Sequence, residues 1–121
     1  MEKKILTIDR SKWNRGKKGP GACLMLNEVG MMCCLGFDAL ACGLTESQIM
    51  GVGTPSMIMD APEEYISKRS TFKEVCMNSP VGDAIRANDN ELMLDSDREI
   101  RVREALIGLG WDDVVFVDGQ P

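Results

Sequence analysis

Residues 31 to 42, MMCCLGFDALAC, are the stretch that decides how this chain folds. If each residue turns a helix by about 100°, apolar side chains cover both of its faces: Met31, Met32, Leu35, Ala39 and Cys42 on one, and Cys33, Phe37 and Leu40 on the other. Asp38 is the only charged member. Because a helix that is apolar all round belongs inside a protein, we expect a central buried helix over about 31–42, ended by Gly43.

Shorter elements are expected on both sides of this helix. Apolar, partly β-branched runs predict strands over 4–8, 22–26 and 114–117. Capping residues and prolines predict short helices: one through Trp13, capped by Asp9 or Ser11, then 45–50, 62–69, 81–87 and 96–108. This order predicts an α+β fold, with a short, mainly antiparallel sheet packed on the central helix.

Length and composition limit the protein further. With 121 residues, the chain supports a single domain over 1–121. It contains no histidine, which excludes Ser-His and Cys-His catalysis and histidine metal sites within one chain. Five cysteines without regular spacing favour reduced thiols, and the short apolar run after Lys3 and Lys4 is too brief for a secretion signal or a membrane span. We therefore expect a cytoplasmic protein.

Charge is distributed unevenly along the chain. The net charge is -5, but residues 1–18 hold seven basic and two acidic residues, whereas residues 19–121 hold seven basic and 17 acidic ones. A basic end on an acidic body favours attraction of an anion by that end and argues against general binding to DNA. The spacing of Ala39, Gly43 and Ile49 fits a helix-turn-helix, but the second helix would contain no lysine or arginine.

Metal sites and reactive thiols are weakly supported. The cysteines form no C-x-x-C unit, and the acidic stretch 89–99 lacks the spacing of a calcium loop, so no metal and no cofactor are expected. The adjacent Cys33 and Cys34 are expected to pack as small apolar side chains, because helix neighbours point about 100° apart and cannot both bind one ion.

The strongest candidate site is the basic, glycine-rich segment around Trp13. Phosphates favour cationic side chains and accessible backbone amides, and a nucleobase favours a flat aromatic partner. This segment supplies all three, and the candidate ligand-binding residues are Arg10, Lys12, Trp13, Arg15, Lys17, Lys18, Gly19 and Gly21. It is neither a Walker loop nor a dinucleotide fingerprint. The alternative is a solvated basic surface over a Trp13 that packs inward.

Several of these residues together resemble a known group. Trp13, Arg15-Gly16, Gly19-x-Gly21 and Leu24 are followed by Met32-Cys33-Cys34-Leu35-Gly36-Phe37 and Ala41-Cys42-Gly43. This order resembles a widespread group of small, uncharacterised phage and prophage proteins with a CCLGF or CCLGV block, and it covers about residues 5 to 50. Asn88-Asp89 also resembles that group. The resemblance implies a setting, a virus-infected bacterial cytoplasm, and no particular reaction.

In that setting we expect a non-enzymatic counter-defence protein that sequesters a phosphorylated nucleotide-derived signal. One alternative is an inhibitor that binds a host defence protein through the acidic stretch 89–99, and another is a thiol enzyme. Ligands of this kind are often enclosed between subunits and a methionine-rich chain makes an adaptable contact surface, so the expectation includes a homo-oligomer.

Overall fold

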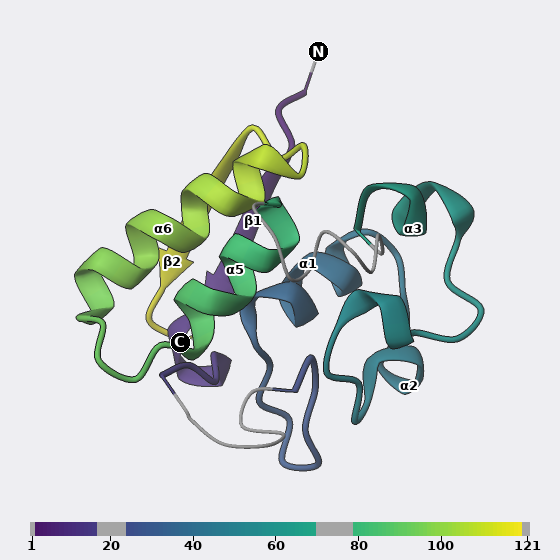
Figure 1. Cartoon of the computed structure of the whole chain (residues 1–121), viewed down its shortest axis with the longest axis horizontal. Coiled ribbons are helices and arrows are strands. Elements are labelled where there is room, and N and C mark those ends of the chain that lie inside the picture. The colour runs from purple at the N-terminus through teal and green to yellow at the C-terminus, as the bar shows by residue number, and fades with distance from the viewer. Residues whose placement is uncertain (1, 17–23, 70–78, 120–121) are drawn as a thin grey trace.

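The computed structural model describes residues 2–16, 24–69 and 79–119. Along the chain, these residues form β1 (Ile5–Asp9), the 3-10 turn η1 (Arg10–Lys12), α1 (Cys34–Ala41), α2 (Glu46–Ile49), the 3-10 turn η2 (Pro55–Met57), α3 (Glu63–Arg69), α5 (Pro80–Asp89), α6 (Asp95–Gly108) and β2 (Asp113–Val117). Figure 1 shows one small α+β domain with α1 near its middle. The predicted fold class is confirmed.

The sheet contains two strands, and they run parallel. β1 pairs with β2 in the register Leu6↔Val114 and Ile8↔Phe116. The expected antiparallel arrangement is therefore wrong. The physical reason is that α6 leads back along the sheet before β2 begins, as a crossover connection between parallel strands requires.

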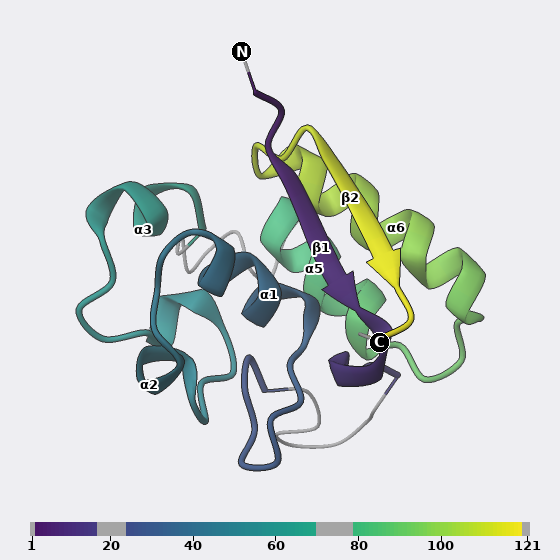
Figure 2. The same cartoon turned by 180° about the vertical axis from the view of Figure 1, so that it is seen from behind.

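Helices cover one face of this sheet. α5 and α6 lie in front of the strands in Figure 1, and the view from behind in Figure 2 shows β1 and β2 nearest the viewer. Leu6, Ile8 and Val114 are almost completely buried, whereas the alternate residues Ile5 and Thr7 are exposed. This alternation follows from the two-residue repeat of a strand with one covered face.

The central helix is buried as predicted, although it is shorter. α1 begins at Cys34 rather than Met31, and Cys34 to Ala39 are all buried. Gly43 follows with φ +99, in the left-handed region that ends helices and that glycine adopts at little cost. The predicted central, doubly apolar helix is confirmed.

Several predicted helix starts are confirmed, and one is wrong. Thr45 and Gln48 form the capping box of α2, and Ser79 caps α5, accepting a hydrogen bond from Gly82 N. Asp9 caps η1 through Ser11 N. The capping box expected at Ser96 is absent, because α6 begins at Asp95 after Leu94, which provides no side-chain cap.

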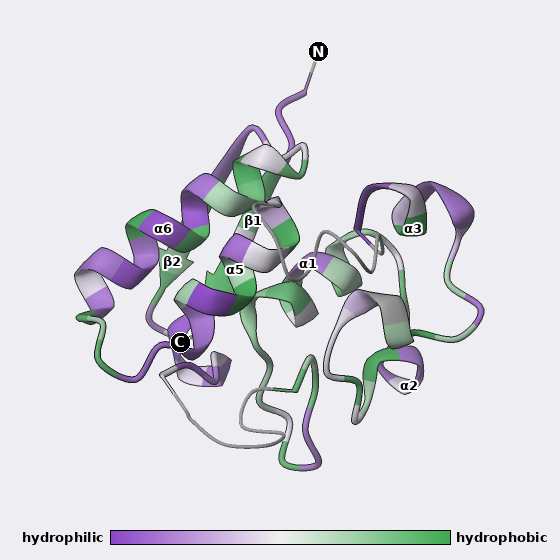
Figure 3. Ribbon diagram, viewed as in Figure 1, coloured by the Kyte–Doolittle hydropathy of each residue, from purple (hydrophilic) through white to green (hydrophobic). Residues whose placement is uncertain are grey.

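The strand expected over 22–26 is not a strand in the described part. Leu24 to Leu26 run as irregular backbone, with one isolated bridge between Leu26 and Met50, and Ala22 and Cys23 lie outside the described residues. This segment instead packs against α1, where Cys33 N donates to Leu24 O. Figure 3 shows the contrast between the largely apolar α1 and the hydrophilic colours along α6. None of the helices in the described ranges is long and apolar enough to span a bilayer.

Candidate functional site

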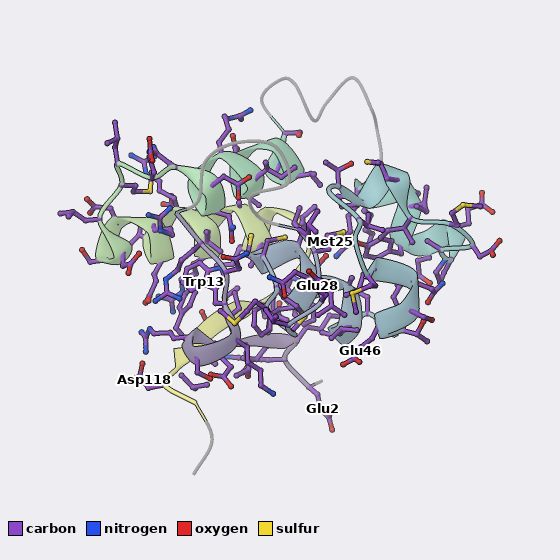
Figure 4. The ribbon with its side chains drawn as sticks, turned by 90° about the horizontal axis from the view of Figure 1, so that it is seen from below. Glu2, Trp13, Met25, Glu28, Glu46 and Asp118 are labelled. Carbon is purple, nitrogen blue, oxygen red and sulfur yellow. The ribbon has the colours of Figure 1, made fainter. Side chains whose placement is uncertain are left out.

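Trp13 of the predicted site packs into the core. Its side chain is 2% exposed, and its indole Nε1 donates a 2.7 Å hydrogen bond to Asn88 Oδ1. The ring of Phe116 lies 5.2 Å from it, centroid to centroid. Figure 4 shows Trp13 in the interior, away from Asp118 at the rim. The indole therefore presents no open face on which a nucleobase could stack.

The guanidinium of Arg15 covers the indole ring of Trp13. Its guanidinium carbon lies 4.6 Å from the Trp13 ring centroid, and Nη1 donates to the carbonyl oxygens of Arg10 and Trp13 at 3.1 and 3.0 Å. Its Nε is 3.5 Å from a carboxylate oxygen of Asp95. Because these contacts occupy the guanidinium, Arg15 is a structural cation in this fold.

Arg10 is also neutralised. Nε and Nη2 bind Glu99 at 2.7 and 2.9 Å, and Nη1 binds Asp118 at 2.9 Å. The hydrogen bonds that Arg10 donates to Glu99 and then to Asp118 raise the pKa of Arg10 above its usual value. Lys12 is exposed and forms no ion pair with the described residues. Lys17, Lys18, Gly19 and Gly21 lie outside the described residues.

Most of the predicted basic pocket thus has another role where the structure describes it. Of the three cations Arg10, Lys12 and Arg15, only Lys12 forms no ion pair with the described residues. The same contacts engage two carboxylates of the acidic stretch 89–99 of the alternative hypothesis, because Asp95 and Glu99 bind arginines of the amino-terminal segment. The sequence contains no signal for these pairings, which join residues 89 positions apart for Arg10 and Glu99 and 80 apart for Arg15 and Asp95.

Residues far apart in the sequence also meet at Asn88. Its Oδ1 accepts hydrogen bonds from Trp13 Nε1 and, at 2.9 Å, from the backbone N of Cys34 at the start of α1. Its Nδ2 donates to Asn14 O at 3.0 Å. Trp13, the first residue of α1 and Asn88, which the sequence analysis compares with a group of phage proteins, are therefore joined by buried hydrogen bonds.

A cavity of about 530 Å³ lies elsewhere, beside the first residues of β1. It is bounded by Lys3 and Lys4, by the end of α1 at Cys42, by α3, and by the turn before β2; the lining residues are Lys3, Lys4, Ile5, Ala41, Cys42, Pro62, Glu64, Tyr65, Lys68, Arg69, Leu109, Gly110 and Trp111. This volume is in the range of small-molecule sites. Four of the lining side chains are basic and one is acidic.

A buried carboxylate fixes one wall of this basic cavity. Asp38 is completely buried and accepts from Arg69 Nε and Nη2 at 2.7 and 2.9 Å. The indole Nε1 of Trp111 donates to the same carboxylate at 2.7 Å. The guanidinium of Arg69 lies 4.7 Å from the ring centroid of Tyr65. The orientations of Arg69 and Trp111 are therefore set before any ligand arrives.

The remaining cations of the basic cavity are available. Lys3, Lys4 and Lys68 are exposed, and their ammonium groups form no ion pair with the described residues. Trp111 is half-buried. The cavity therefore offers three lysine charges, unpaired in the described structure, beside an aromatic ring of fixed orientation, which are two of the three features that the sequence predicts for the segment around Trp13.

Two further groups of the basic cavity carry titratable protons. Burial, and then the charge of Asp38, raise the pKa of the Cys42 thiol. Burial followed by Asp38 also raises the pKa of Tyr65, whose hydroxyl is buried and has no hydrogen-bond partner among the described residues. Both groups therefore stay protonated at neutral pH, and Cys42 is not an activated thiolate.

Sequence reasoning missed this cavity, although part of its signal was present. Lys3 and Lys4 belong to the basic amino-terminal end, and Lys68-Arg69 are the first basic residues after Lys18. No pattern indicated that α3 and the first residue of β1 border the same cavity, because that arrangement depends on how both elements are placed around α1. Comparisons with protein families, curated proteins and solved structures find no match to this chain.

Other chemistry has less support in the described residues. Across 2–16, 24–69 and 79–119, no three cysteine, aspartate or glutamate side chains lie close enough to hold a metal ion. A second groove of about 530 Å³ runs between α5 and α6, but its lining includes no aromatic side chain and it mixes Arg86 and Arg101 with Asp83 and Glu104. The basic cavity is the better candidate for an anionic ligand.

Proposed function

We propose that this protein binds a phosphorylated, nucleotide-type small molecule in the basic cavity and holds it without changing it chemically. The observation that carries the proposal is the meeting of Lys3, Lys4 and Lys68 with the fixed indole of Trp111 around a cavity of about 530 Å³. The ligand class is the one that the sequence suggests, and its proposed position moves from Trp13 to Trp111.

The three lysines would bind the phosphates. An ammonium group is a compact positive charge on a flexible stem, so it can follow a phosphate group that differs in position from one ligand to another. Lys3 and Lys4 precede β1, and Lys68 projects from the last turn of α3. Phosphates between these two elements would be neutralised from both sides.

Trp111 would contact the nucleobase. Base stacking on an aromatic ring contributes about 1–3 kcal/mol and tolerates different bases. The hydrogen bond to Asp38 already holds the indole, so little side-chain freedom would be lost on binding. Stacking would therefore add affinity with little selectivity among bases.

Binding without turnover agrees with the chemistry of the lining residues. The chain contains no histidine, and the raised pKa values of Cys42 and Tyr65 keep both groups protonated and weakly nucleophilic. A protein with these properties could act by mass action, lowering the concentration of a signalling nucleotide. In the cytoplasm of a phage-infected bacterium, as the resemblance suggests, such sequestration would blunt a nucleotide-based defence.

The test is calorimetric titration of the full chain with a panel of cyclic and linear nucleotides. Lys68→Glu should weaken binding of the best ligand at least about tenfold, or about 1.4 kcal/mol, because it replaces a phosphate-binding charge with a repelling one. Lys12→Glu is the matched control, since it makes the same charge change at an exposed lysine outside the cavity and should bind like the wild type.

The two variants separate the possible outcomes. Loss of binding in Lys12→Glu with normal binding in Lys68→Glu would return the site to the amino-terminal segment and overturn the cavity. No heat from any nucleotide in the panel would overturn the proposed function itself. Trp111→Phe, which keeps an aromatic ring but removes the bond to Asp38, should retain part of the affinity.

A further inference from the structure

One region of the chain has an unusual charge pattern that the proposed nucleotide site does not use. Between residues 19 and 67 there is no lysine or arginine, whereas six carboxylates occur. One of them, Asp38, is buried against Arg69. The other five are exposed: Glu28, Glu46, Asp60, Glu63 and Glu64. The described residues 24–67 therefore carry only negative formal charge.

Large apolar side chains are exposed within the same region. Met50, Met57 and Met59 are 47%, 64% and 76% exposed. They belong to one connected unit, because Met50 ends α2 and Gln48 of that helix donates a 3.1 Å hydrogen bond to the carbonyl oxygen of Asp60, next to Met59. We call this unit the acidic methionine surface and define it as Met50, Met57 and Met59 with Glu46, Asp60 and Glu63.

Methionine suits a surface that receives another chain. Its unbranched, polarisable side chain adapts to partners of different shape, and exposed apolar side chains gain free energy when a partner covers them. Glu46, Asp60 and Glu63 form no ion pair with the described residues, so they add a long-range attraction for cations. Figure 4 labels Glu46 of this surface, and also Glu28, an exposed carboxylate in the turn after Leu26 that is not part of the surface.

We propose that the acidic methionine surface docks a basic amphipathic helix or peptide of a partner protein. The apolar side of such a segment would cover the methionines, and its lysines or arginines would meet Glu46, Asp60 and Glu63. Charge complementarity favours this occupant over a second copy of the same surface, because two such surfaces would bring carboxylates together. It also excludes nucleic acid as the occupant.

This surface is distinct from the proposed nucleotide site in charge and in ligand. The basic cavity draws an anion to Lys3, Lys4 and Lys68, whereas the acidic methionine surface draws a cation. Either proposal can therefore fail while the other holds. If both hold, the protein captures a small molecule in the basic cavity and a macromolecule on the acidic methionine surface.

The experiment uses a fluorescently labelled, synthetic amphipathic peptide of lysine and leucine and measures its anisotropy as full-length protein is added. A peptide with glutamate in place of lysine is the charge control. We expect saturable binding of the lysine peptide alone, weakened at least about tenfold between about 50 mM and about 500 mM salt, as screening requires.

Variants then locate the binding surface. Met57→Gln combined with Met59→Gln should weaken binding of the lysine peptide at least about tenfold, because both substitutions remove apolar contact area. Leu92→Gln with Leu94→Gln is the matched control, since these leucines are 89% and 70% exposed but lie before α6. Circular dichroism verifies that both double variants are folded.

Three results would overturn the proposal. The first is an absence of binding by the lysine peptide. The second is unchanged binding by the Met57→Gln, Met59→Gln variant. The third is self-association of the wild type in sedimentation velocity that the same variant abolishes, which would make a second copy the occupant. In each case the response of Lys68→Glu to nucleotides still reports separately on the basic cavity.

Discussion

Both tryptophans are anchored through their indole nitrogens by a buried polar side chain. Trp13 donates to Asn88 and Trp111 donates to Asp38. Since a buried donor without a partner costs about 1–3 kcal/mol, each anchor fixes the orientation of a large ring. The two anchors differ in consequence: Asn88 holds Trp13 inside the core, whereas Asp38 holds Trp111 at the margin of the basic cavity.

Replacing Asn88 with alanine should strongly destabilise the fold. Asn88→Ala removes the acceptor for Trp13 Nε1 and Cys34 N and the donor to Asn14 O, all in a buried setting. We expect the free energy of unfolding to fall by about 3 kcal/mol or more, because several polar groups lose their partners together. Urea denaturation followed by far-ultraviolet circular dichroism measures this loss.

A neighbouring asparagine provides the control. Asn90 is exposed, and its side chain accepts one hydrogen bond, from Leu92 N. Asn90→Ala should cost no more than about 1 kcal/mol. If both variants lose the same free energy of unfolding, the buried hydrogen bonds of Asn88 do not stabilise the fold as expected.

Residue identities alone were insufficient to predict the site around Trp13. The composition of that segment suits a phosphate pocket. In the folded chain, however, residues from distant elements bind its side chains. Arg10 finds Glu99 and Asp118, and Trp13 finds Asn88, 75 positions away. Local sequence shows which charges are present, but it does not show which of them a distant helix neutralises.

At the scale of elements, α1 depends on the absence of a side chain at Gly36. A Cβ built there would lie 1.9 Å from the carbonyl oxygen of Met25 and 2.9 Å from Cβ of Met32. The backbone of the Leu24 to Leu26 segment thus packs directly on the helix. A glycine inside a helix usually weakens it, so this position exchanges helix propensity for close packing.

Gly36→Ala should therefore destabilise the protein, although alanine is the better helix former. Because the obstructing atom is backbone, the segment around Met25 must shift, and we expect a loss of about 3 kcal/mol in the free energy of unfolding. The melting temperature measured by circular dichroism reports this loss.

Gly53→Ala is the matched substitution in open space, where a Cβ meets no atom of the described structure within 4 Å. It should change stability by less than about 0.5 kcal/mol. A Gly36→Ala variant as stable as Gly53→Ala would contradict the close approach of Met25 to α1.

Local signals predicted elements well where one residue decides the outcome. The caps at Asp9, Thr45 and Ser79 and the stop at Gly43 depend on neighbouring backbone only, and they are confirmed. The expected strand over 22–26 failed in its described part, because a strand needs a partner and Leu24 to Leu26 instead packs on Gly36. The antiparallel pairing was wrong for the same kind of reason.

The whole molecule separates its charges by location. Arginines of the amino-terminal segment bind carboxylates of the carboxy-terminal third, and Lys3, Lys4 and Lys68 line the basic cavity. The described residues 24–67 carry carboxylates and no lysine or arginine. The net charge of -5 is therefore an average that describes neither the basic cavity nor the acidic region. An anion and a cation would be attracted to different places on it.

Ion pairs between arginines and aspartates predict that the free energy of unfolding falls in acid. Hydrogen bonds from Arg103 lower the pKa of Asp113 below its usual 3.8. Burial opposes the charge on Asp95, but Arg98 and Arg15 outweigh that effect and lower its pKa as well. Groups whose pKa is lower in the folded state stabilise the fold above about pH 4, and that contribution disappears as pH falls through the folded values.

We therefore expect the free energy of unfolding to be nearly constant between about pH 7 and about pH 5 and to decrease below about pH 4. Urea denaturation across this range measures the decrease. Asp113→Asn should make the decrease in the free energy of unfolding smaller. Glu104→Gln, at an exposed carboxylate without an ion pair to arginine in the described structure, should leave that decrease unchanged. A decrease that Asp113→Asn leaves unaltered would contradict the role of the Arg103 pair.

The parallel pairing of β1 with β2 also governs how the protein emerges from the ribosome. Contacts such as that of Lys4 with Asp112 span 108 positions, so the first strand to be synthesised waits for nearly all of the later helices before it gains its neighbour. Until then, Leu6 and Ile8 lack the strand beside which they are finally buried. Translation speed and chaperone access should therefore influence the yield of native protein more than in a fold built from hairpins.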